Sequence, residues 1–248
     1  MLSTTYIAVI LLSFLSVLTT LIGVILAVFL KKSVKGIAIG IGFSAGIMLL
    51  ISLFELVPES VATAGILETS ISIFLGIVFI GILNFIIPHT HLIKEKDKFE
   101  GHLLKSAYLI ALGLILHDFP EGFAMANSYI YSPSLGFLIA IAIAIHNIPE
   151  EFAMAVPIVT LKKKSFLFKA AFFSGLSEPA GAIIGLLAVN FIPFLNPIFM
   201  SFAAGAMIFV SIHELLPMAK KYKRTALFIL GIILSVFVYL MLSILIPE

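Results

Sequence analysis

Two stretches of the chain decide its fold: HDFPEGFAM at residues 117–125 and HNIPEEFAM at residues 146–154. Both place a histidine, an acid or amide, a proline and a glutamate at matching positions inside long apolar runs. An ionisable side chain at the middle of a membrane helix costs about 2.5–3.5 kcal/mol on insertion scales, and such residues usually have a function. We therefore expect the two stretches to face each other inside a bundle of membrane helices.

The composition is that of an integral membrane protein. Of 248 residues, 61% are hydrophobic and 11% are charged, and the mean hydropathy is +1.22. A soluble domain is about one half apolar and about one quarter charged. The chain has no cysteine, which excludes disulfides and thiolate metal sites. The first apolar run has no basic residue before it and exceeds the core of a signal peptide, so we expect a retained spanning helix.

Eight apolar segments are each long enough to cross a bilayer, which takes about 20 helical residues. A spanning segment satisfies its backbone hydrogen bonds internally when it is a helix, and no segment alternates over ten residues as a barrel strand would. We predict an all-α polytopic membrane protein with one domain (1–248) and a polar cytoplasmic loop at 89–104. The predicted helices cover residues 5–30, 36–58, 66–88, 104–127, 134–160, 166–192, 195–218 and 224–246.

The basic residues predict the orientation. With eight helices, all 15 Lys and Arg residues fall in the four connections on one side of the membrane, and that side is then cytoplasmic. Both termini are predicted to be extracytoplasmic, in a plasma or inner membrane. The polar loop contains His89, His91 and His102, for which a solvated flexible loop and a weak metal-collecting or sensing loop both remain open.

An internal repeat relates the two ends of the chain. Residues 43–58 (FSAGIMLLISLFELVP) align with residues 202–217 (FAAGAMIFVSIHELLP) at a constant offset of 159 residues. The two copies lie on the second and seventh predicted helices, which cross the membrane in opposite directions. We therefore predict an inverted repeat of helices 1–3 and 6–8 around helices 4 and 5, an arrangement typical of alternating-access transporters.

The spacing within the two motifs indicates a site for divalent cations. His117 and Glu121 lie one turn apart on the same helix face, and His146 and Glu150 repeat this spacing. No Lys or Arg lies at this depth, so protons or bound cations must neutralise the carboxylates. Two imidazoles and two carboxylates form a nitrogen and oxygen ligand set that suits zinc, iron(II), manganese, cobalt and cadmium.

Further polar residues are expected around this cluster. Asp118 and Asn147 lie on the adjoining helix faces, where they could form a second binding point that shares Glu121 and Glu150. The sixth helix adds the carboxylate of Glu178. The candidate pathway residues are Glu55 near the outer end of the second helix, His213 and Glu214 near the inner end of the seventh, and Glu151, which could line the pathway or accept a proton.

The paired HxxPE motifs, the segment Ser177-Glu178-Pro179 and the eight-helix arrangement resemble the ZIP (Zrt-, Irt-like) family of divalent metal transporters, in particular its prokaryotic GufA/ZupT-like branch. The resemblance implies uptake of metal into the cytoplasm through a binuclear centre. It implies one site at His117, Glu121, His146 and Glu150, a second at Asp118, Asn147 and Glu178 bridged by Glu121 and Glu150, and an inner exit at His213 and Glu214. The chain departs from the family at Asp118, where Asn is usual, and at Glu151, where Gly is usual.

We therefore predict a transporter that imports zinc, with iron(II), manganese, cobalt and cadmium as further candidate cargoes. We expect no enzyme activity, no cofactor and no nucleic-acid partner. The expected partners are the metal ions and the lipid bilayer, and a homodimer stays open. Two alternatives also stay open: an intramembrane zinc-dependent hydrolase with Glu151 as its base, and a proton-coupled carrier of another substrate.

Overall fold

The computed structural model describes residues 2–30, 33–86, 101–159 and 164–247, and these ranges are helical except for short connections. They contain no strand, which confirms the all-α prediction. The elements are α1 (Leu2–Phe29), α2 (Val34–Ile51), η1 (Ser52–Leu56), α3 (Val57–Ala64), α4 (Ile66–Ile86), α5 (Gly101–Tyr131), α6 (Pro133–Val159), α7 (Lys164–Gly175), α8 (Ser177–Phe191), η3 (Pro193–Leu195), α9 (Asn196–Val210), η4 (Ser211–Leu215), α10 (Leu216–Lys221) and α11 (Thr225–Leu245).

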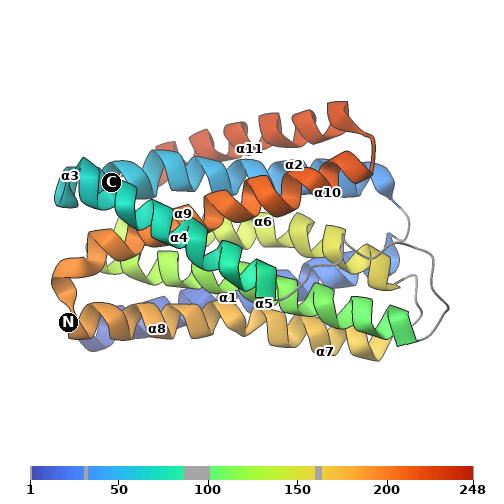
Figure 1. The fold of residues 1–248 in the computed structure, drawn as a ribbon, viewed down its shortest axis with the longest axis horizontal. Helices are drawn as coiled ribbons and strands as arrows, with labels where there is room; N and C mark the ends of the chain where they lie inside the picture. Colours follow the sequence, from blue (N-terminus) through green and yellow to red (C-terminus); the bar gives the residue numbers. More distant parts are fainter. Residues whose placement is uncertain (1, 31–32, 87–100, 160–163, 248) are drawn as a thin grey trace.

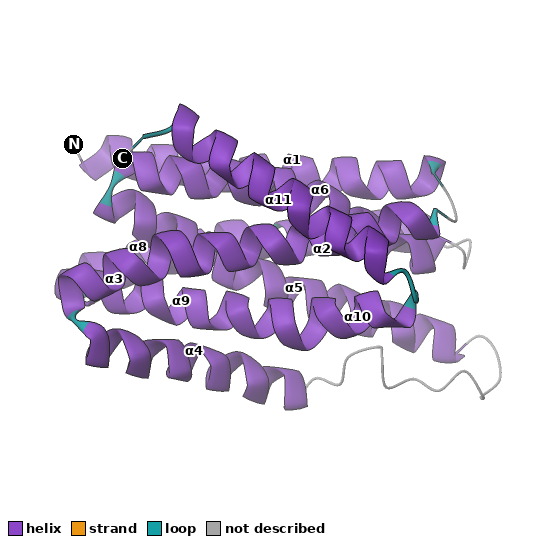
Figure 2. Ribbon diagram, turned by 90° about the horizontal axis from the view of Figure 1, so that it is seen from above, coloured by secondary structure: helices purple, strands orange, loops and turns teal. Residues whose placement is uncertain are grey.

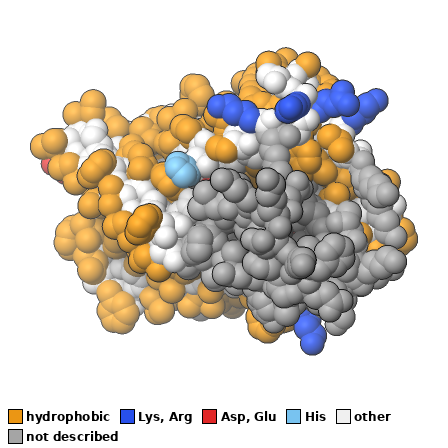
Figure 3. Space-filling model, turned by 45° about the vertical axis from the view of Figure 1, so that its right-hand side comes forward, with side chains coloured by type: hydrophobic (Ala, Val, Ile, Leu, Met, Phe, Trp, Pro, Cys, Tyr) orange, Lys and Arg blue, Asp and Glu red, His pale blue; other side chains and the backbone are white. Residues whose placement is uncertain are grey.

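The helices lie side by side along the long axis of the molecule (Figures 1 and 2). Both termini lie at one end, and α2, α5, α7 and α11 begin at the other (Figure 1). Figure 3 brings this second end forward and shows Lys and Arg side chains on it. The predicted orientation depends on this arrangement, but which end faces the cytoplasm stays a prediction. His89 and His91 lie outside the described residues, as does the side chain of His102.

The helices confirm a polytopic membrane protein. In the described part of the chain, seven helical segments are long and apolar enough to cross a membrane. The 31-residue α5, which carries the first motif, packs against α6, α8 and α9 as a further long helix. The apolar windows of α4 and α11 are 22% buried, whereas those of the α2–α3 segment and α6 are 67% buried. Helices α4 and α11 therefore lie at the lipid-facing edge, and the α2–α3 segment and α6 lie nearer the centre. Apolar side chains cover much of the described surface in Figure 3.

Three local features depart from a set of uniform α-helices. The sixth predicted helix is divided at Leu176 into α7 and α8. The second and seventh predicted helices each contain a π-helical turn, η1 and η4. These turns start at Ser52 and Ser211, which are separated by the same 159 residues as the sequence repeat. Single π-turns inside α-helices are frequent at functional sites.

The packing of the helices also follows the repeat. The most extensive pairings are α2 with α11, α4 with α9, α1 with α6, and α5 with α8. The repeat relates α2 to α9, α4 to α11 and α1 to α8, and we relate α5 to α6. With these exchanges the pairing of α2 with α11 becomes that of α9 with α4, and the pairing of α1 with α6 becomes that of α8 with α5. These correspondences favour the inverted repeat, which remains an interpretation.

In space, the helices form two bundles that differ from the order of the repeats. The first bundle contains α1, α5, α6, α7 and α8, and the second contains α2, α3, α4, α9, α10 and α11. The bundles meet mainly where α2 packs on α6 and where α5 packs on α9. Both motifs belong to the first bundle, and both motif helices lie along its boundary with the second.

Candidate metal centre

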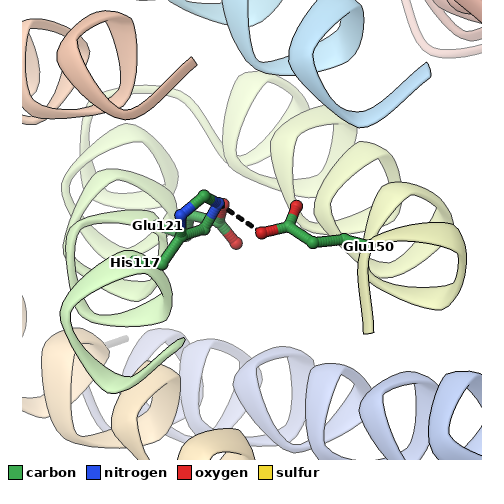
Figure 4. Close-up of side chains that lie close together, drawn as sticks. All are labelled: His117, Glu121 and Glu150. Atoms are coloured by element: carbon green, nitrogen blue, oxygen red, sulfur yellow. Dashed lines mark ion pairs between the residues drawn. The ribbon is translucent and has the colours of Figure 1, made fainter. Parts of the chain in front are cut away.

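The two motifs meet across the boundary between α5 and α6, near the middle of each helix. His117 and Glu121 project from one helix toward Glu150 on the other (Figure 4). His117, Glu121, His146 and Glu150 are each at most 4% exposed. The structure therefore brings the four side chains together in one buried cluster, which we call the His/Glu cluster.

Within this cluster each histidine contacts the glutamate of the opposite helix. His117 Nε2 forms an ion pair with Glu150 Oε1, and His146 Nε2 lies 3.1 Å from Glu121 Oε1. The contacts along each helix are longer, at 3.8 Å for His117 with Glu121 and 3.9 Å for His146 with Glu150. One ligand atom from each of His117, Glu121 and Glu150 lies within 4.8 Å of the other two. This spacing suits a single ion bound between the helices.

The ring of His146 is oriented by its own helix. Its Nδ1 lies 2.9 Å from the carbonyl oxygen of Ala142. A carbonyl only accepts hydrogen bonds, so Nδ1 carries the proton and Nε2 points into the cluster. An outer hydrogen bond of this kind is typical of histidines that bind metal, because it fixes both the tautomer and the ring orientation.

Glu121 has a buried carboxylate oxygen that accepts no hydrogen bond from the described residues. Its side chain is fully buried, and its Oε2 has no hydrogen-bond partner among the described residues. A buried carboxylate is costly unless a positive charge and hydrogen bonds compensate it. A cation in the cluster would supply that compensation.

Three further polar residues next to the motif ligands, Asp118, Asn147 and Glu178, are also buried. Asp118 Oδ2 accepts hydrogen bonds from Ser174 Oγ at 2.7 Å and Ser177 Oγ at 3.3 Å. Asn147 Nδ2 donates to Glu178 Oε2 at 3.3 Å and to the hydroxyl of Ser16 at 2.6 Å. The predicted second set of ligands is therefore divided between two buried hydrogen-bonded groups, Asp118 with two serines and Asn147 with Glu178 and Ser16.

Two glycines allow Glu178 to approach the first motif. A Cβ atom on Gly122 would lie 1.9 Å from the carbonyl oxygen of Glu178, and one on Gly181 would lie 2.1 Å from that of Phe119. Real Cβ atoms essentially never come within 3.0 Å of such neighbours. The backbones of α5 and α8 are therefore in direct contact, which places the start of α8 beside the metal-binding face of α5.

Glu151 occupies a different position from the other acids. It is 2% exposed and lies against α1, where a Cβ atom on Gly23 would be 2.7 Å from the Cβ of Glu151. Because Glu151 follows Asn147 by one turn, it belongs to the α1-facing side of α6. The described metal-ligand group does not include it, and its role stays a prediction.

The remaining pathway candidates lie in the two π-helical turns. Glu55 accepts a hydrogen bond from Tyr239 of α11 at 2.5 Å, and Glu214 accepts one from Asn84 of α4 at 3.4 Å. In each case the donor lies on the helix that packs most extensively beside the segment with the π-turn: α11 packs on α2, and α4 packs on α9. His213 is exposed and stacks on Phe209 with ring centroids 4.7 Å apart. The described metal-ligand group does not include these residues, and their place on a pathway stays a prediction.

The sequence did not reveal the serines that support the polar residues. Ser44 of α2 donates a hydrogen bond to Glu150 Oε2, and Ser16 of α1 contacts Asn147. A single serine in an apolar helix has no spacing partner that would mark it. Only the packing of α1 and α2 on α6 makes these contacts visible.

Comparison with known proteins gives a consistent result. A family model described as ZIP Zinc transporter matches residues 88–245, which include both motifs and Glu178. A protein named zinc transporter ZupT from Clostridium perfringens is 38% identical over 259 residues, covering 90% of each chain. Proteins of the same name from Streptococcus mutans and Chlorobium luteolum are 38% and 37% identical, covering 87% and 91% of this chain and 89% and 93% of their own.

Proposed function

Since the chain belongs to the ZIP family of zinc transporters, we propose that it holds zinc at the His/Glu cluster while carrying it across the membrane. The protein is a multi-pass membrane protein and a divalent-metal transporter, not an enzyme. The intramembrane hydrolase considered from the sequence is therefore not supported. The observation that carries the proposal is the crosswise convergence of two imidazoles and two carboxylates at the middle of α5 and α6.

The chemistry of binding follows from the contacts within the cluster. Each histidine now faces a glutamate, and an arriving ion would replace these contacts with bonds from Nε2 and from the carboxylate oxygens. Metal ligands must be deprotonated, so binding releases any protons that the cluster holds. Nitrogen and oxygen ligands suit zinc and extend the proposal to iron(II), manganese, cobalt and cadmium.

We assign a second ion to the group formed by Asp118, Asn147 and Glu178, with Glu121 and Glu150 as bridges. Two facts support this assignment. The three side chains are buried, with Asn147 bonded to Glu178, and Glu121 has a carboxylate oxygen without a partner in the described residues. The bridging glutamates would then be shared between two cations, which would compensate their charge.

We infer import into the cytoplasm by alternating access, with both termini outside the plasma or inner membrane. The positive-inside rule supports this orientation, because the eight-helix prediction places all 15 Lys and Arg residues on one side of the membrane; import is what the family resemblance implies. The boundary between the two bundles supports alternating access, because the cluster lies on it and relative movement of the bundles would change which end reaches the ion. A homodimer stays a prediction.

Zinc influx into liposomes tests the proposal. We would reconstitute the full chain with a zinc-sensitive dye inside and compare it with His117→Ala and Glu150→Ala. Each variant should lose at least about tenfold of the influx, since even outer-shell changes weaken metal sites by about 10–100-fold. Glu68→Gln, which changes an exposed acid on α4, is the matched control and should behave as wild type. Unchanged influx in both cluster variants would refute the assignment.

A further inference from the structure

One hydroxyl group from the second bundle reaches the His/Glu cluster. Ser44 lies on α2, is fully buried, and donates a hydrogen bond from Oγ to Glu150 Oε2. The two bundles pack together where α2 meets α6. Ser44 is therefore a direct link between the proposed metal ligands and the helices that do not carry them.

This contact gives the two oxygens of Glu150 different partners. Oε1 faces His117 Nε2, and Oε2 faces Ser44. Oε2 also lies 3.9 Å from His146 Nε2, which is just beyond hydrogen-bond distance. His146 Nε2 is instead 3.1 Å from Glu121 Oε1, so the Ser44 hydroxyl is the hydrogen-bond partner that holds Glu150 Oε2 in place.

The repeat shows that this support is provided on one side only. Ser44 corresponds to Ala203 of α9 at the offset of 159 residues, and Ala203 is also fully buried. The repeat likewise exchanges α6 with α5, and therefore Glu150 with Glu121. Glu121 is the glutamate whose Oε2 lacks a partner in the described residues, as expected if α9 offers no hydroxyl at the equivalent place.

We propose that Ser44 is a positioning residue of the metal centre. It holds Oε2 of the Glu150 carboxylate, so that Oε1 stays directed at His117 Nε2 and at the place where the ion would bind. Glu150 therefore has a hydroxyl donor from α2, whereas Glu121, which occupies the same position in the other motif, has none from α9 among the described residues. The inference rests on the proposed function of the His/Glu cluster and adds a residue that determines how tightly and how selectively that cluster binds.

The test compares zinc and cadmium binding by the purified full chain, using isothermal titration calorimetry. Ser44→Ala should raise the Kd for zinc about tenfold, the lower end of the range for outer partners of metal ligands. Cadmium should be weakened less, because a released carboxylate can bind a larger ion through both oxygens. Ser60→Ala is the matched control, since Ser60 is equally buried in the same segment but donates only to the carbonyl of Leu56.

The reciprocal variant gives an independent readout. Ala203→Ser in the Ser44→Ala background offers a donor to Glu121 instead of Glu150, and it should recover part of the zinc affinity. A Ser44→Ala protein whose zinc Kd stays within about twofold of wild type, or which loses zinc and cadmium affinity equally, would overturn the proposal. If the wild type itself binds no zinc, the proposed function fails instead, so the two failures are distinguishable.

Discussion

The contact between α5 and α8 makes Gly122 a sensitive point for the proposed second ion. Gly122 is part of the first motif, but its importance comes from its neighbour rather than from metal chemistry. The substitution Gly122→Ala adds one methyl group at the place where the two backbones touch. It should separate α8, and with it Glu178, from the metal-binding face of α5.

The size of the effect can be estimated from the structure. The new Cβ would lie 1.9 Å from the carbonyl oxygen of Glu178, whereas ordinary contact begins at 3.4 Å. The helices must therefore separate by about 1.5 Å, and overpacking of this kind costs about 1–3 kcal/mol. The gain in helix propensity from Gly to Ala is about 1 kcal/mol and offsets part of that. The 3.3 Å hydrogen bond from Asn147 to Glu178 would not survive a shift of this size, because a donor and acceptor 3.6 Å apart are no longer bonded.

The assay is thermal unfolding followed by circular dichroism, since the chain has no Trp for fluorescence, together with zinc influx into liposomes. Gly81→Ala on α4 is the matched control, because the nearest atom to its new Cβ is a ring carbon of Phe209 at 3.5 Å. We expect Gly122→Ala to melt lower than wild type and to transport more slowly. The Gly81 variant should melt at the wild-type temperature or slightly above it. If the two variants had the same melting temperature and influx, the inferred contact between α5 and α8 would be wrong.

Three further predictions follow from the site. Glu121→Gln should raise the Kd for zinc at least about tenfold, because it removes a ligand charge, and an unchanged calorimetric Kd would contradict the assigned role of Glu121. Tyr239→Phe removes the hydrogen bond to Glu55 outside the cluster. It should change the rate of zinc influx but leave the Kd as in wild type, and a changed Kd would place Glu55 in the binding site instead. Free zinc at 100 times its Kd should stabilise the folded protein by about 2.7 kcal/mol. At the same zinc concentration it should fall to about 1.4 kcal/mol or less in His117→Ala, where the Kd rises at least about tenfold, and an unchanged zinc-induced shift of the melting curve would point to a different site.

Much of the fold could be predicted because a membrane-spanning helix requires a long, nearly continuous run of apolar residues, which is visible in the sequence. Each apolar run is long enough to span the bilayer, and the polar residues between runs define where helices end. The π-helical turns could not be predicted in this way. A turn such as η1 widens the helix locally without altering its hydropathy, so the repeat of residues 43–58 gave no sign that Ser52 begins a π-turn.

The ligand set was partly predictable for a related reason. The spacing of His117 and Glu121 is a property of one helix, and so is that of His146 and Glu150. The crosswise pairing of each histidine with the opposite glutamate depends on how α5 and α6 are rotated against each other. The support from Ser44 depends on how α2 sits on α6. Such relations between helices are set by packing over the whole bundle and leave no local spacing in the sequence.

The unequal surroundings of the two equal motifs have a consequence for transport. At one boundary Gly122 lets α8 approach α5, whereas at the equivalent boundary Glu151 faces Gly23 of α1. Glu150 likewise has the Ser44 hydroxyl, whereas Glu121 has Ala203 at the equivalent place. If an inverted repeat exchanges the surroundings of the site as access alternates, unequal support means that the inward-facing and outward-facing states bind the ion with different free energies. The ion would then shift the equilibrium between the two states, whereas an ion bound equally in both would leave that equilibrium unchanged. The residues that distinguish the motifs, more than those they share, are therefore the ones through which this chain could set which state the bound ion favours.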